Sequence, residues 1–419
     1  MTATYEETLD WLYHLEAKRG MDFRLARLDP VLDRLGHPER AFTCVHIAGT
    51  NGKGSTAAMI EAALRAGGHR TGLYTSPHLV SFRERIRMAG VPASRREVVA
   101  SISAVRTAME AARQELTFFE IVTLAALHAM RERGVAVAVI EAGLGGRLDA
   151  TNVAYGQVCA ITSVDIDHAE YLGDTIASIA FEKAGIVKPG SVLVTGALPC
   201  EAEKVVAARV EETSARWLAY GRDFGDFAPM VQAQLDGTAR LPGTHQRRNA
   251  AVAATVVEQL GERFPVEPSQ RDRAIVEARW PGRLELIEGA PVVVLDAAHN
   301  PESASALAAA LEETRIARPR TLVFAAMADK DWRAMLAALR PCFDDAVFVP
   351  LSMARAEAPR RFLEAWPQAR VAASPEEGLA LARQLSAGHG SVVIAGSIFL
   401  LGHLYRSAGG SLLEQDLSD

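Results

Sequence analysis

Cysteine is scarce in this sequence, and no apolar run is long enough to cross a membrane. The four cysteines are far apart, and no two have the spacing of a zinc or redox motif. Scattered thiols are typical of a reducing compartment, so we expect them to be unpaired and buried. The apolar run Val135–Ala142 has the length of a strand rather than of a membrane span. The cysteines are Cys44, Cys159, Cys200 and Cys342.

The sequence also lacks blocks of lysine or arginine. Its formal net charge is -6 at pH 7, which argues against general nucleic-acid binding. The first residues are neither basic nor apolar, so they do not resemble a secretory signal. The 419 residues, 49% of them hydrophobic and 23% charged, are typical of a globular protein with two domains. We therefore expect a cytoplasmic protein that binds neither nucleic acid nor membranes.

Short apolar runs alternate with helix-like stretches along most of the chain. Val135–Ile140 is apolar throughout, as in a strand buried on both faces of a parallel sheet. Such alternation predicts an α/β fold with parallel pairing. The stretch Asp223–Pro242 loses this regularity, and we expect a small β meander there. We also expect a loop at 20–23 and a frayed end at 411–419.

A glycine-rich turn lies between an apolar strand-like run, Phe42–Ile47, and a helix-like stretch, Ala57–Ala66. Glycines allow backbone N–H groups to surround phosphate oxygens, and the helix N-terminus adds a favourable dipole. Lys53 supplies a positive charge for the terminal phosphates. The turn departs from the standard Walker pattern, since Ile47 stands at a glycine position and Gly54 at a hydroxyl position. The alternative is a βα turn that binds no ligand.

The sequence Trp280-Pro281-Gly282-Arg283 interrupts the alternation, and a second series of strands and helices follows. It predicts two domains. The first, residues 1–280, would be a P-loop ATPase domain with a mostly parallel sheet and a small β region. The second, residues 281–419, would be a Rossmann-like α/β domain.

Polar residues follow two of the buried strands. Glu141 directly follows the apolar run Val135–Ile140. His168 is the last residue of Asp165-Ile166-Asp167-His168, which follows the next predicted strand. Ligands collect at the carboxyl ends of parallel strands, so Glu141 suits Mg²⁺ held by few protein groups together with phosphates and water. His168 suits a second cation, since phosphoryl transfer often uses more than one. The alternatives are that Glu141 caps a loop and that His168 is an ordinary polar residue.

Other candidate residues are ambiguous when taken alone. Taken alone, Lys183 is interpreted as a lysine that interacts with the dipole at a helix C-terminus. Ser76 is interpreted as a loop serine beside Pro77. Asp296 and His299 either bind ligand or cap a helix and form a turn. Arg283 either reaches a terminal phosphate or is a linker residue.

Seven motifs nevertheless occur in one order, and together they resemble the folylpolyglutamate synthase/dihydrofolate synthase family of the Mur ligase superfamily. The resemblance spans essentially the whole chain. The motifs are Gly49-Thr-Asn-Gly-Lys-Gly-Ser55, Thr75-Ser-Pro-His-Leu79, Glu141-Ala-Gly-Leu-Gly-Gly-Arg-Leu-Asp-Ala-Thr-Asn152, Asp167-His168, Phe181-Glu-Lys-Ala-Gly-Ile-Val-Lys188, Pro281-Gly-Arg-Leu284 and Asp296-Ala-Ala-His-Asn-Pro301.

The resemblance implies an ATP-dependent amide ligase that adds L-glutamate to dihydropteroate and to the γ-carboxylate of folates through an acyl phosphate. It implies two Mg²⁺ sites, a possible monovalent cation and a monomer. Lys53, His168 and Lys183 would be catalytic, with Lys183 carbamylated. Metal ligands would be Ser76, Glu141, His168 and the carbamate of Lys183. ATP would bind to Asn51, Gly52, Lys53, Gly54, Ser55, Asn249, Arg283, Asp296 and His299, and the pterin to Phe119, Leu148 and Asp149.

Two other kinds of enzyme share parts of this pattern. Mur peptidoglycan ligases carry a nucleotide-sugar domain before the phosphate loop, and fewer than fifty residues precede the loop here. A P-loop kinase or ATPase of another class would explain Lys53 but not the second α/β domain. The sequence leaves open whether the enzyme adds one glutamate or extends a chain.

Overall fold

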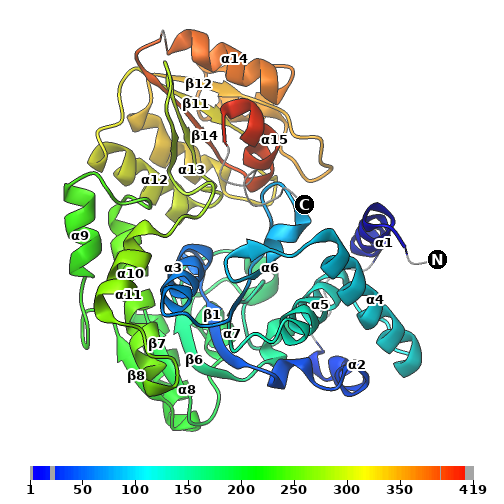
Figure 1. The fold of residues 1–419 in the computed structure, drawn as a ribbon. Coiled ribbons are helices and arrows are strands. Elements are labelled where there is room, and N and C mark those ends of the chain that lie inside the picture. Colours follow the sequence, from blue (N-terminus) through cyan, green and yellow to red (C-terminus); the bar gives the residue numbers. More distant parts are fainter. Residues whose placement is uncertain (1–2, 19–23, 387, 411–419) are drawn as a thin grey trace. The chain divides into compact units, whose positions relative to one another are not determined.

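The computed structural model describes residues 3–18, 24–386 and 388–410, and its ribbon is drawn in Figure 1. The predicted loop at 20–23 and the frayed end at 411–419 lie outside these residues. The chain forms two compact units. The first comprises the residues up to 231 together with 248–278, and the second comprises 232–247 together with the chain from 279 onward.

The first unit is built on an eight-stranded sheet in the order β4-β3-β2-β5-β1-β6-β7-β8. The six strands β2, β5, β1, β6, β7 and β8 pair in parallel with their neighbours. In this sheet, only the pairings of β3 with β2 and β4 are antiparallel. The strands are β1 Thr43–Ala48, β2 Thr71–Tyr74, β3 Ile86–Met88, β4 Val91–Pro92, β5 Val137–Glu141, β6 Gly156–Ile161, β7 Val192–Thr195 and β8 Arg216–Ala219.

Helices cover both faces of this sheet, because strands such as β1 and β5 are buried at every residue and need apolar cover on each side. The helices are α1 Tyr5–Lys18, α2 Asp29–Leu35, α3 Lys53–Ala66, α4 Arg95–Ala112, α5 Phe118–Glu132, α6 Ala169–Leu172, α7 Ile176–Ala184, α8 Cys200–Thr213, α10 Thr244–Gln259 and α11 Pro268–Glu277. Of these, α10 begins in the second unit and continues in the first. Short 3-10 helices lie at Leu25–Leu28, Pro38–Arg40, Phe82–Arg85, Ala150–Val153 and Gly261–Arg263.

The predicted β meander at Asp223–Pro242 is wrong. The segment contains a helix, α9, from Ala228 to Leu235. Phe227, Met230 and Ala233 are buried, and their three-residue spacing puts them on one helical face. The apparent alternation in the sequence concealed this longer period. The expectation of buried cysteines is confirmed for three of the four thiols, but Cys200 is exposed because it occupies the first turn of α8.

The second unit has a six-stranded sheet in the order β13-β12-β11-β14-β10-β9, parallel except for β9 at one edge. Its strands are β9 Glu285–Ile287, β10 Val292–Leu295, β11 Arg320–Phe324, β12 Asp345–Phe348, β13 Arg370–Val371 and β14 Ser391–Ala395. Its helices are α12 Pro301–Glu313, α13 Trp332–Leu339, α14 Pro375–Leu385 and α15 Ile398–Ala408, with 3-10 helices at Arg340–Cys342 and Pro359–Glu364. The predicted two-domain α/β fold is confirmed.

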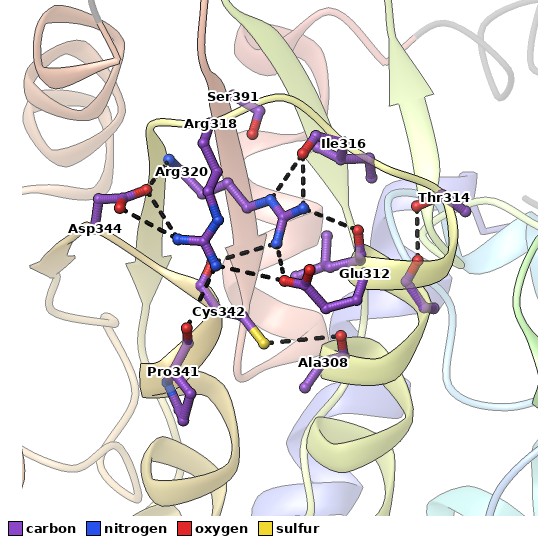
Figure 2. A network of polar contacts seen from close by, with 12 residues as sticks. Ala308, Glu312, Thr314, Ile316, Arg318, Arg320, Pro341, Cys342, Asp344 and Ser391 are labelled. Carbon is purple, nitrogen blue, oxygen red and sulfur yellow. Dashed lines mark hydrogen bonds and ion pairs between the residues drawn. The ribbon is translucent and has the colours of Figure 1, made fainter.

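A buried arginine fastens the start of β11 to the end of α12. The Nη2 of Arg320 donates to the carbonyl oxygens of Leu311 and Ile316, at 3.0 Å and 2.7 Å. Figure 2 shows the Arg320 guanidinium directed at Ile316 and paired with Glu312. The side chain is only 3% exposed. Because α12 has ended by this point, its last carbonyl groups need such donors. Arg320 thus sets where the chain turns from helix to strand.

Candidate active site

Four neighbouring strands bring their carboxyl ends together at one edge of the first sheet. The order β2-β5-β1-β6 places β1 between β5 and β6, with Ile47 opposite Glu141 and Ala48 opposite Ile161. The loops after these strands carry the phosphate-loop, Ser76, Glu141 and His168 motifs. The sheet therefore gathers the four predicted motifs at the edge where ligands of parallel α/β sheets bind.

The phosphate loop is held by the loop that follows β6. The N–H groups of Thr50 and Asn51 donate to Ser163, at 2.9 Å to its carbonyl oxygen and 3.0 Å to its Oγ. The hydroxyl of Thr162 donates to the carbonyl oxygen of Asn51 at 2.6 Å. Lys53 folds its Nζ back onto the carbonyl oxygens of Gly49 and Thr50, at 2.9 Å and 3.2 Å. The protein's own hydrogen bonds therefore define the conformation of the phosphate loop.

Gly52 and Asn249 explain why this loop contains glycine. Gly52 has a φ of 84°, and a Cβ there would lie 2.5 Å from Oδ1 of Asn249. Asn249 lies on α10 and is buried. The chain thus returns about two hundred residues after the loop to place a carboxamide against it. The ATP-binding residues predicted in the first unit, from Asn51 to Ser55 and Asn249, form one group.

Ser76 and Glu141 are in direct contact. The N–H of Ser76 donates to Oε2 of Glu141 at 3.2 Å, and the Glu141 carboxylate is buried at the end of β5. The loop after Ser76 is held by Glu84, whose carboxylate accepts N–H groups from Leu79 and Val80 at 2.8 Å each. Ser81 adds a third N–H to the same carboxylate. A buried carboxylate therefore fixes the loop that presents Ser76.

His78, in the same loop, is neutral. Arg85 donates from Nε to Nδ1 of His78 at 2.9 Å, so this ring nitrogen must carry a lone pair. Burial, together with the charge of Arg85, lowers the pKa of His78 to about 3. His78 therefore acts here as a hydrogen-bond acceptor rather than as a cation.

His168 lies just before α6 and Lys183 lies on α7, the two short helices that follow β6. His168 precedes α6, has a φ of 52°, and its side chain is 41% exposed. Lys183 is on the last turn of α7 and is only 3% exposed. Among the described residues, no group of three or more His, Cys, Asp or Glu side chains is arranged to hold a metal ion. Serine hydroxyls and modified lysines can also bind cations, so Ser76 and Lys183 remain candidate ligands.

The loop from Gly143 to Asp149 lies between Phe119 and α7. A Cβ at Gly143 would lie 2.4 Å from Cζ of the Phe119 ring, so the loop backbone rests directly on this ring. Asp149 is buried, which raises the pKa of its carboxyl group. Its carboxylate accepts N–H groups of Leu144 and Thr151, at 2.8 Å and 3.0 Å. Leu148 stays half-buried beside it.

The candidates of the second unit form their own group after β10. The two oxygens of Asp296 accept the N–H groups of Leu284 and Ala298, both at 2.8 Å. Burial raises the pKa of Asp296, and the nearby positive charge of Arg283 opposes this. Nδ1 of His299 forms a hydrogen bond with the carbonyl oxygen of Ala297 at 2.9 Å. Asp296 thus connects the strand end to the loop that carries Arg283.

Comparison with known proteins decides the family. The Mur ligase middle domain matches residues 47–257, and the Mur ligase glutamate ligase domain matches residues 282–398. Folylpolyglutamate synthase of Lacticaseibacillus casei is 35% identical over 94% of this chain and 96% of its own length. The chain belongs to the folylpolyglutamate synthase/dihydrofolate synthase family. It is an ATP-dependent glutamate ligase.

Solved structures of the family agree with this assignment. The folylpolyglutamate synthase of Mycobacterium tuberculosis, complexed with ADP and AMPPCP, matches with a TM-score of 0.89 and 32% identity, over 97% of this chain and 99% of that one. The bifunctional folylpolyglutamate synthase/dihydrofolate synthase of Yersinia pestis, complexed with AMPPNP and Mn ion, matches with a TM-score of 0.87 and 29% identity, over 97% and 98%. The ligase therefore uses ATP and a divalent metal. Nothing in these matches favours a kinase.

Several residues that shape the ligase site were missed in the sequence. Thr162, Ser163 and Glu84 were not among the predicted site residues, but they hold the phosphate loop and the Ser76 loop in place. The pattern Ser81-x-x-Glu84 is a capping box, and it was the available signal for Glu84. In the described part of the chain, no helix is both long and apolar enough to cross a bilayer. The cytoplasmic location stays a prediction.

Proposed function

We propose that this ligase adds L-glutamate to dihydropteroate and also to the γ-carboxylate of folates, in both cases through an acyl phosphate. The observation that supports this most is that the phosphate loop and the bonded pair Ser76 and Glu141 lie at the carboxyl ends of neighbouring strands. A carboxylate is a poor electrophile, and phosphorylation gives it a leaving group. The bifunctional name of the Yersinia pestis relative supports the use of both acceptors.

The phosphate loop would hold ATP for transfer of its terminal phosphate to the acceptor carboxylate. The glycine-rich backbone and the start of α3 would face the phosphate oxygens. Lys53 now bonds the loop carbonyls, and it would exchange them for phosphate oxygens when ATP binds. Asn249 would contact the nucleotide from α10. The positive charge of Lys53 would stabilise the transferring phosphoryl group.

We further propose two Mg²⁺ sites, with Ser76, Glu141, His168 and a carbamylated Lys183 as protein ligands. The bound cations would spread the negative charge that develops during phosphoryl transfer. The residues fit this role, since a serine hydroxyl and a buried carboxylate are both hard oxygen donors, and the backbone N–H of Ser76 bonds the Glu141 carboxylate. Lys183 is only 3% exposed, and carbamylation would make it an anionic oxygen donor suited to a divalent cation.

The acceptor and the amine would use the remaining candidates. Phe119, Leu148 and Asp149 would form the pterin site, with the Phe119 ring against the loop backbone. Arg283, Asp296 and His299 would be further ATP-contacting residues, with His299 near the glutamate. We also propose that the enzyme is a monomer and that a monovalent cation assists it.

The deciding experiment combines the purified enzyme with MgATP, labelled glutamate, and either dihydropteroate or tetrahydrofolate. We expect phosphate release that requires both glutamate and an acceptor, and labelled products whose masses differ from the acceptors by one or more glutamyl groups. Phosphate release that ignores both co-substrates would contradict the ligase mechanism. Turnover of dihydropteroate alone would restrict the enzyme to dihydrofolate synthesis. Omitting potassium and sodium in turn tests the monovalent cation.

A further inference from the structure

Arg147 lies at the junction between the loop of the proposed pterin site and the helix of Lys183. Its backbone N–H donates to the carbonyl oxygen of Glu182 at 2.7 Å. A Cβ at Gly185 would lie 2.3 Å from Cβ of Arg147, so the two backbones touch. Arg147 therefore lies beside both Leu148 of the proposed pterin site and Lys183 of the proposed metal site.

The Arg147 side chain is held on two sides. Its Nε and Nη2 both donate to Oε1 of Glu182, at 3.1 Å and 2.7 Å. Its guanidinium carbon lies 5.2 Å from the centre of the Phe181 ring, in a cation–π contact. A guanidinium fixed in this way loses little rotamer freedom when it binds a further group, so it is preorganised.

One edge of this guanidinium remains available. Within the described part of the chain, Nη1 of Arg147 makes no hydrogen bond, and the side chain is 41% exposed. Arginine presents paired N–H donors that match the geometry of a carboxylate. The open edge therefore suits an anionic oxygen group of a bound substrate.

We propose that Arg147 is a specificity-determining residue that binds the non-reacting α-carboxylate of a glutamyl group already present on the acceptor. This rests on the proposed function, which supplies acceptors of two kinds. Dihydropteroate has one carboxylate, and it is the one that reacts. A folate has a γ-carboxylate that reacts and an α-carboxylate that must be accommodated unchanged. Only the second kind of acceptor needs an additional cation.

The carboxylate of Glu182 would compete with an acceptor carboxylate for the guanidinium of Arg147, and this gives a second test. Glu182→Gln keeps an oxygen that accepts the bonds from Nε and Nη2 but removes the negative charge. If Arg147 only fastens the loop to α7, weakening either partner harms the enzyme in the same direction. If Arg147 binds the acceptor, removal of the competing charge strengthens its attraction for a carboxylate. The two variants then change the KM for folate in opposite directions.

The test measures kcat and KM of the whole enzyme for dihydropteroate and for tetrahydrofolate. For Arg147→Gln we expect the KM for tetrahydrofolate to rise about tenfold, the low end for a bond between charged groups because the site is half-exposed. The KM for dihydropteroate should rise several-fold less. For Glu182→Gln the KM for tetrahydrofolate should fall. Arg147→Lys, which keeps the charge but not the fork, should lie between wild type and Arg147→Gln.

Arg222 provides a matched control. It also pairs with a neighbouring acid, Asp223, at 2.9 Å and lies over an aromatic ring, with 4.4 Å from its guanidinium carbon to the centre of Trp217. It follows β8, the edge strand that β5, β1, β6 and β7 separate from β2. Arg222→Gln should leave the KM values for both acceptors unchanged.

Equal changes of the two KM values in Arg147→Gln would overturn the proposal, as would a rise in the KM for tetrahydrofolate in Glu182→Gln. The Glu182→Gln result decides the matter even if Arg147→Gln does not fold. A wild-type enzyme that uses dihydropteroate but not tetrahydrofolate would also overturn it, and would leave the glutamate ligation standing. Failure of the wild-type enzyme with both acceptors would instead contradict the proposed function.

Discussion

A side chain at position 52 would meet two separate obstacles, and their effects can be measured apart. The backbone of Gly52 has a φ of 84°, where a residue with a Cβ pays roughly 1–2 kcal/mol. The added Cβ would also lie 2.5 Å from Oδ1 of Asn249, which is too close for any real contact. In Gly52→Ala we therefore expect a loss of stability of about 1–2 kcal/mol and a displaced Asn249 carboxamide.

Gly68 separates these two effects. It has a similar φ of 80°, but nothing lies within 4 Å of its virtual Cβ. Gly68→Ala should therefore lower the melting temperature as Gly52→Ala does, by about 2–4 °C per kcal/mol for a unit of this size. Only Gly52→Ala should raise the KM for ATP. We expect about tenfold, the effect of losing one hydrogen bond to a charged phosphate.

A double-mutant cycle completes the test. In an Asn249→Ala background the clash is absent, so Gly52→Ala should change the KM for ATP much less than it does in the wild type. The reasoning is refuted if Gly52→Ala and Gly68→Ala have the same KM for ATP. It is also refuted if the effect of Gly52→Ala is unchanged in the Asn249→Ala background.

Three further predictions concern other parts of the chain. Lys183→Ala should lose activity that short carboxylic acids partly restore in a rate assay, because they replace a carbamate oxygen; full activity without them would exclude a metal-bridging carbamate. Arg320→Met should lower the free energy of unfolding in urea by about 1–3 kcal/mol, since it leaves the buried carbonyl oxygens of Leu311 and Ile316 without this donor. Arg333→Ala at an exposed ion pair should cost less than about 1 kcal/mol, and equal losses would count against the buried network. Burial lowers the pKa of His46 from 6.5 to about 3, so the unfolded chain binds the extra proton and stability falls as the pH drops below 6.5; by pH 5 this amounts to about 2 kcal/mol. His46→Gln should therefore flatten the pH dependence of the melting temperature between pH 7.5 and 5, and the exposed His14→Gln should not.

Local patterns in the sequence were sufficient for the strands and for the polar residues at their ends. Val137–Glu141 is a strand because every residue before Glu141 is apolar, and Glu141 therefore had to emerge at the carboxyl end. The order of the strands could not be predicted in the same way. Parallel strands joined by helices are compatible with many orders, and only long-range packing selects the one that places β1 between β5 and β6.

The contacts that complete the site join residues far apart in the sequence. Asn249 reaches Gly52 from another helix, and nothing local in α10 indicates this partner. Lys183 looked like a residue that balances a helix dipole, and its burial depends on the loop that packs against α7. The α9 segment was misread for the opposite reason, since its few apolar residues fit a strand and a helix almost equally well over such a short length.

The second unit is discontinuous in the chain, and this limits how the protein can be divided. Residues 232–247 belong to it, although they precede the first unit's last helices. Thr244 donates from its N–H and hydroxyl to Glu313 at 2.9 Å and 2.7 Å, inside the second unit. A gene fragment that begins at residue 279 would lack this segment and would leave Glu313 without these donors. Recombination that exchanges this unit between related enzymes would therefore need three crossovers, at 231/232, 247/248 and 278/279, so the two units are expected to evolve as one gene.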